Sequence, residues 1–68
     1  MKSKESIKLG NQLRKSREEA GLSQATLAKK AGINVNYYAI IERGEKNVSY
    51  EKLQRIAKVL NIKSLDMR

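Results

Sequence analysis

The side chains of this sequence are suited to holding a polyanion rather than to catalysis. Its 68 residues include 15 lysines and arginines against 7 aspartates and glutamates, so the formal net charge is +8. Histidine and cysteine are absent, which removes the usual general base and the commonest metal ligands. We therefore expect no enzyme active site, no metal and no cofactor. The charge favours nucleic acid as partner, then an anionic membrane surface; a basic surface that only aids solubility is the alternative.

One segment, Val35–Arg43, combines an amide side chain with apolar ones on a single helical face. If Tyr38 and Ile41 face the core, the helical period turns the opposite side chains outward. The outward side chains are then Val35, Asn36, Ala39, Ile40 and Arg43. Asn36 is suited to paired hydrogen bonds with adenine, and the aliphatic side chains beside it can contact thymine methyl groups.

Three predicted helix starts share one pattern that would aim such a helix. Each has an apolar residue, then Ser or Asn, then an apolar residue four places further along. The Ser or Asn is suited to cap the helix, and the two apolar residues form a hydrophobic staple. The three sets are Leu22, Ser23 and Leu27; Ile33, Asn34 and Tyr38; and Val48, Ser49 and Leu53.

The first helix is expected to begin at Ser3 or Ser6 and to end at Gly21. Gly10 lies inside it, where glycine is unfavourable, so it marks either a close helix–helix approach or a later true start. The predicted inward stripe contains Leu9, Leu13, Arg17 and Ala20. Residues 1–5 are polar and are expected to form a frayed arm.

The remaining signals predict one all-α domain over residues 1–68, a compact bundle of four to five short helices. A fourth helix is expected over about residues 50–60, and Ser64 can cap a last turn. The turn at Gly32 is too short for antiparallel helices, so residues 23–43 are predicted to form a helix-turn-helix. We expect no signal peptide and no membrane span, because no apolar run approaches the ~20 residues that a span needs.

Several motif elements together give the sequence a family resemblance. They are Leu13-Arg14, Arg17, Gly21 to Gln24, Leu27-Ala28, Gly32 and Ile41 to Gly44. Over roughly Leu9 to Ile62 the chain resembles the Cro/repressor-type (XRE family) transcriptional regulators, which include small restriction–modification controller proteins. The resemblance implies a lambda-repressor-like fold in a cytoplasmic regulator that binds double-stranded DNA. It also implies a homodimer on an inverted repeat, with half-sites about 34 Å apart, and no small-molecule ligand.

The resemblance also assigns roles to individual residues. The base-facing set is Val35, Asn36, Ala39 and Ile40. The set implied to contact the DNA backbone is Arg14, Ser23, Gln24, Tyr37, Arg43, Lys46 and Asn47. Arg17 and Glu42 match a pair that forms a partly buried salt bridge. On that basis we expect Arg17→Ala to lower stability and Arg17→Met to fold about as well as the parent or better.

The sequence departs from the family at Val35 and Ile40, positions that are often polar or basic in relatives. Two apolar residues there lower the hydrogen-bonding capacity of the outward face. They support an alternative function, a protein-interaction module such as an antitoxin or adaptor. The tail Ile62–Met67 offers apolar side chains that either contribute to a dimer contact or close the core.

Overall fold

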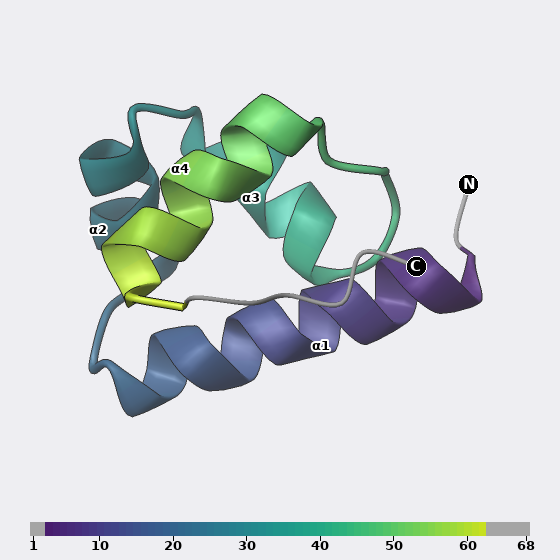
Figure 1. Ribbon diagram of the computed structural model, residues 1–68, viewed down its shortest axis with the longest axis horizontal. Coiled ribbons are helices and arrows are strands. Elements are labelled where there is room, and N and C mark those ends of the chain that lie inside the picture. Colours follow the sequence, from purple (N-terminus) through teal and green to yellow (C-terminus); the bar gives the residue numbers. More distant parts are fainter. Residues whose placement is uncertain (1–2, 63–68) are drawn as a thin grey trace.

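The computed structural model describes residues 3–62, and over this range the protein consists of four α-helices and no strand (Figure 1). They are α1 (Lys4–Glu19), α2 (Gln24–Ala31), α3 (Val35–Glu42) and α4 (Tyr50–Leu60). In Figure 1, α1 runs along one edge and the three shorter helices lie on one side of it. The predicted all-α fold is confirmed. The expected last turn at residues 64–67, and most of the apolar tail, lie outside the described residues.

The three predicted helix caps are confirmed. The Ser23 Oγ accepts a hydrogen bond from the backbone N–H of Thr26 at 3.0 Å. The Asn34 Oδ1 accepts from two backbone N–H groups at the start of α3, at 2.8 and 3.2 Å. The Ser49 Oγ accepts from the Lys52 backbone N–H at 3.3 Å. The apolar residues before the caps, Leu22, Ile33 and Val48, pack against the core, so each helix enters at a fixed angle.

Both predicted ends of the first helix are confirmed, since Ser3 caps its start and Gly21, at φ 73°, follows its C-cap, but the frayed arm and the inward position of Ala20 are not. Ser3 is its N-cap and Lys4 its first residue, so residues 3–5 begin α1 and do not form the expected frayed arm. The Ser3 side chain accepts from the Ser6 backbone N–H at 3.1 Å, which satisfies an otherwise unpaired donor. At the other end Ala20 is exposed. It is the C-cap, where the chain leaves the helix and carries the side chain off the inward stripe.

The core is formed by one cluster of buried side chains drawn from all four helices. Its members are Leu9, Leu13, Leu27, Ala28, Ala31, Tyr38, Ile41, Leu53 and Ile56. Tyr38 is the largest side chain that is fully buried. None of the described helices is long and apolar enough to cross a membrane.

Gly10 resolves the two alternatives that the sequence left open. It lies within α1 and is buried where the end of α3 crosses. A Cβ placed on it would lie 2.7 Å from the Ile41 carbonyl oxygen and would also clash with the carbonyl of Glu42. Gly10 therefore marks a close backbone approach of α1 to α3, and not a late helix start.

We expect Gly10→Ala to destabilise the protein by roughly 1–3 kcal/mol, because the added methyl would push the α3 backbone away. Helix propensity alone predicts the opposite, a gain of about 1 kcal/mol. Urea unfolding followed by circular dichroism distinguishes the two, with Asn11→Ala at the neighbouring exposed position as control. A Gly10→Ala protein more stable than the parent would contradict the close approach.

Candidate nucleic-acid interface

The turn between α2 and α3 fixes the position of α3. Gly32 adopts a left-handed conformation with φ of 71°. The Ile33 backbone N–H donates to the Ala28 carbonyl oxygen at 2.9 Å, which closes the end of α2. Val35 begins the next helix only three residues after Gly32, so α2 and α3 form a helix-turn-helix.

The outward side chains of α3 are less uniform than the sequence suggested. Asn36 and Arg43 are exposed, and Val35 is 39 % exposed. Ala39 and Ile40 are only half-buried rather than open to solvent. The outward surface is therefore dominated by Val35 and Asn36 at the start of the helix.

A polar network holds the other end of α3. The Arg17 Nε donates to the Glu42 Oε2 at 2.5 Å, and the exposed fractions of the two side chains are 13 % and 3 %. Gln24, at the start of α2, donates from Nε2 to the Glu42 Oε1 at 3.0 Å. Arg17 also donates from Nη1 to the Leu22 carbonyl oxygen at 2.8 Å. One carboxylate thus ties together α1, α2 and α3.

The electrostatics of this network stabilise its charged form. Burial acts to raise the pKa of the Glu42 carboxyl, but hydrogen bonds and the charge of Arg17 outweigh burial and hold that pKa below its usual value. The hydrogen bond to Glu42 raises the pKa of Arg17. Burial, and secondarily the Glu42 carboxylate, raises the pKa of Tyr38. The Tyr38 hydroxyl has no hydrogen-bond partner of good geometry among the described residues.

Two lysines converge on the ring of Tyr37. The Lys46 Nζ lies 5.6 Å from the ring centroid and the Lys52 Nζ lies 4.9 Å from it, within the range of cation–π attraction. Lys46 comes from the loop before α4 and Lys52 from the first turn of α4. The aromatic ring thus gathers two positive charges beside α3.

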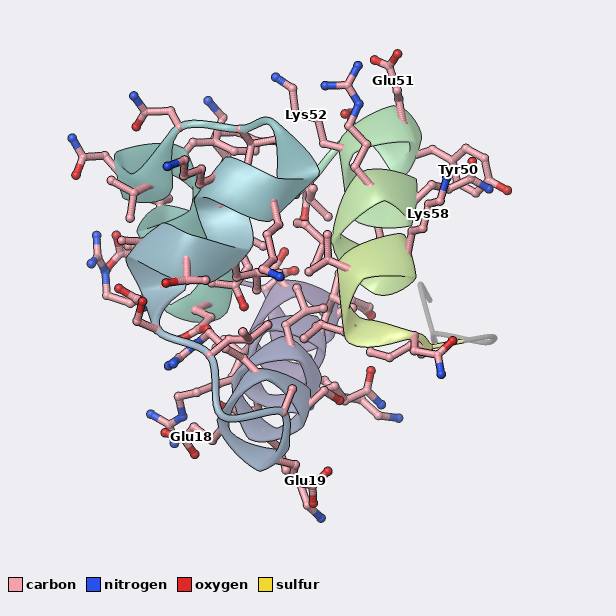
Figure 2. All side chains as sticks on the ribbon, turned by 90° about the vertical axis from the view of Figure 1, so that its left-hand side faces the viewer. Glu18, Glu19, Tyr50, Glu51, Lys52 and Lys58 are labelled. Carbon is pink, nitrogen blue, oxygen red and sulfur yellow. The ribbon has the colours of Figure 1, made fainter. Side chains whose placement is uncertain are left out.

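Lys52 was not among the predicted interface residues. The sequence places it on the polar face of α4, together with Arg55 and Lys58. Helical side chains lean toward the N-terminus of their helix, so a lysine in the first turn reaches back over the preceding loop. Figure 2 shows Lys52 and Lys58 on different sides of α4. The position of Lys52 in the first turn of α4 could therefore have indicated that it lies near the interface. Its place on the polar face of the helix could not, because Lys58 shares that face in the sequence pattern.

Other predicted backbone-contacting residues are already engaged within the protein. Asn47 accepts through Oδ1 a hydrogen bond from the Ser6 hydroxyl. The Arg43 Nε lies 3.2 Å from the Glu45 Oε2, and the exposed fractions of the two side chains are 56 % and 40 %, so this solvated pair contributes little to stability. Ser23 uses its hydroxyl as the α2 cap, and Arg14 is exposed on α1 about one turn before Arg17. The structure thus brings Lys46 and Tyr37 together, whereas Arg14 lies apart from them on α1.

The burial of Glu42 changes what we expect of Arg17 variants. Both Arg17→Ala and Arg17→Met would leave an almost fully buried carboxylate without its cation, at a cost of about 3 kcal/mol. The expectation that Arg17→Met is tolerated is therefore revised. The double variant Arg17→Met/Glu42→Gln should recover most of the loss, because it removes the charge and keeps an acceptor for Gln24.

The pH dependence provides a second check on this network. Without Arg17, desolvation would raise the pKa of Glu42 in the folded protein above its value in the unfolded chain. The loss of unfolding free energy caused by the substitution is then largest at neutral pH, and it shrinks as the Glu42 carboxyl becomes protonated. Urea unfolding of Arg17→Met should therefore show a smaller loss at about pH 4 than near neutrality. An equal loss at both, or no rescue by the double variant, would contradict the role of Glu42 as a buried charge.

Comparison with known proteins agrees with this geometry. A sequence profile described as helix-turn-helix matches residues 13–67. The control protein C.MunI of Mycoplasma sp. is 40 % identical over 57 residues, which cover 82 % of this chain and 77 % of that protein. The crystal structure of the restriction–modification controller protein C.AhdI from Aeromonas hydrophila superimposes with a TM-score of 0.83 at 40 % identity. The match covers 85 % of this chain and 88 % of that one. The chain therefore belongs to the helix-turn-helix family of DNA-binding transcriptional regulators.

Proposed function

We propose that two copies of the protein bind an inverted repeat in double-stranded DNA, with α3 of each copy in the major groove. The observation that carries this proposal is the placement of α3. Its end is braced through Glu42 and its start is capped by Asn34, while Val35 and Asn36 remain exposed. A rigid helix with a free outward face is what groove reading needs.

The proposed contacts divide into base-facing and backbone-facing groups. The base-facing side chains are Val35, Asn36, Ala39 and Ile40. The backbone-facing ones are Arg14, Ser23, Gln24, Tyr37, Arg43, Lys46 and Asn47, to which we add Lys52. Gln24 fits this role because the start of α2 offers unpaired amides that favour an anion. The Gln24 side-chain amide, which donates to Glu42, would then also help to fix the position of α2 along the DNA backbone.

The size of the reading helix supports the proposed dimerisation. The eight residues of α3 span about 12 Å, which covers only a few base pairs. Two copies on half-sites about 34 Å apart would read a longer sequence. We further propose that the protein acts in the cytoplasm without catalysing a reaction, as a regulator similar to the controller proteins that it resembles.

Selection from a random pool of DNA duplexes tests the proposal. We expect retained duplexes to carry an inverted repeat, and Asn36→Ala to lose enrichment at one position of each half-site while still binding DNA. Retention without any enriched sequence would leave backbone affinity alone. No retention at moderate salt would overturn the proposal and favour the alternative of a protein partner on the face that carries Val35.

The salt dependence of DNA binding tests whether Lys52, one of the two lysines at the Tyr37 ring, contacts a phosphate. Neutralising one phosphate-contacting lysine should reduce the slope of log K against log salt by roughly one for each bound copy. We expect this for Lys52→Gln, measured by fluorescence anisotropy on the selected duplex. Lys58→Gln is the matched control, because it removes the same charge from the other side of α4. A Lys52→Gln slope equal to that of the parent protein would show that Lys52 contacts no phosphate.

A further inference from the structure

We infer that the base readout of this protein depends on methyl groups at the C5 position of pyrimidines, so that cytosine methylation can alter its affinity. The inference rests on the proposed function and concerns what the outward face of α3 can recognise. It assigns to Val35, and to the half-buried Ile40 one turn after Asn36, the role of methyl sensors.

The first support is the chemistry that this face lacks. From Val35 to Ile41 the helix carries no charged side chain, and Asn36 is the exposed member with hydrogen-bonding groups. Reading guanine in the major groove relies mainly on arginine or lysine, which bond the O6 and N7 acceptors. Arg43 lies at the far end of the helix and is paired with Glu45. The exposed start of α3 is therefore poorly equipped to read G·C pairs through hydrogen bonds.

The second support is the apolar surface that replaces those groups. Val35 is 39 % exposed at the first position of α3, directly beside Asn36. The major-groove edges of the bases offer an aliphatic side chain one apolar partner, the C5-methyl group of thymine. Asn36 can bond adenine through N6 and N7. The two side chains together suit a short A·T-rich step with a methyl group at a fixed place.

The occupant of this face is DNA rather than an apolar protein partner because of the charges that border it. Lys46 and Lys52 are held beside Tyr37, the residue that follows Asn36. Arg43 lies at the other end of the same helix. A small apolar patch with two lysines held at its border suits a groove floor beside a phosphate backbone better than an apolar protein surface.

A methyl sensor has a consequence for modified DNA. In 5-methylcytosine the methyl group occupies the same ring position as in thymine and points into the same groove. Val35 would contact it equally well, whereas unmodified cytosine offers only hydrogen there. Methylation at a sensed position would thus convert a weak site into a stronger one without changing the base sequence.

Base analogues in the selected duplex test the inference. Replacing thymine by uracil removes only the methyl group, and at one or two positions in each half-site we expect binding to weaken about fourfold, which corresponds to ~0.8 kcal/mol per buried carbon. At those positions a 5-methylcytosine·guanine pair should bind about fourfold more tightly than a cytosine·guanine pair. If uracil at every tested position leaves the affinity unchanged while the duplex still binds, the inference is overturned and the proposed function stays intact.

Protein variants assign the effect to this face of α3. In Val35→Ala or Ile40→Ala, the penalty for uracil should largely disappear at one of the sensitive positions. Tyr50→Ala is the control, because Tyr50 is 63 % exposed on the side of α4 that carries Lys58 and not Lys52, so it should leave the penalty unchanged. Thermal unfolding checks that each variant is folded. A penalty that persists unchanged in both α3 variants would mean that uracil acts through DNA shape, and the inference would fail.

Discussion

Burying the charge of Glu42 obliges three helices to keep one arrangement. An ionised carboxylate with a side-chain exposure of 3 % is costly unless cations and donors surround it. Arg17 and Gln24 meet this need from α1 and α2, so neither helix can shift without leaving the carboxylate short of partners. The direction in which α3 points is therefore set by electrostatics as well as by apolar packing.

The contact between α1 and α3 combines this charge with close backbone packing. Gly10 and Arg17 are seven residues apart, which places them on the same face of α1 two turns from each other. Gly10 lets the helix backbones touch at the carbonyls of Ile41 and Glu42, and Arg17 reaches the carboxylate of the same Glu42. In a chain this short, where the buried core is small, two such contacts at one crossing limit sliding of the helices.

The features that sequence reasoning predicted well are local ones. The caps at Ser23, Asn34 and Ser49 need only the few residues that follow them, so their pattern is legible without the fold. The pairing of Arg17 with Glu42, 25 positions apart, is the exception: the family resemblance implied it, and a charge on an apolar stripe needs a partner.

The features that were missed depend on contacts between distant segments. The approach of Lys52 to Tyr37 requires the angle between α3 and α4, and the hydrogen bond from Ser6 to Asn47 joins residues 41 positions apart. The partial burial of Ile40 depends on how neighbouring side chains cover α3. None of these contacts has a periodic or local signature, so propensity and spacing could not indicate them.

The link between Ser6 and Asn47 has a consequence for the loop that precedes α4. The loop is anchored at Asn47 by α1, and Gly44 at its start packs directly against Ile7. Lys46 lies between these two anchors. A loop held on both sides before any ligand arrives has little conformational entropy left to lose. Lys46 would then meet a phosphate as part of a rigid surface. How well it binds would depend on the match between the shapes of this surface and the DNA backbone, and not on ordering of the loop.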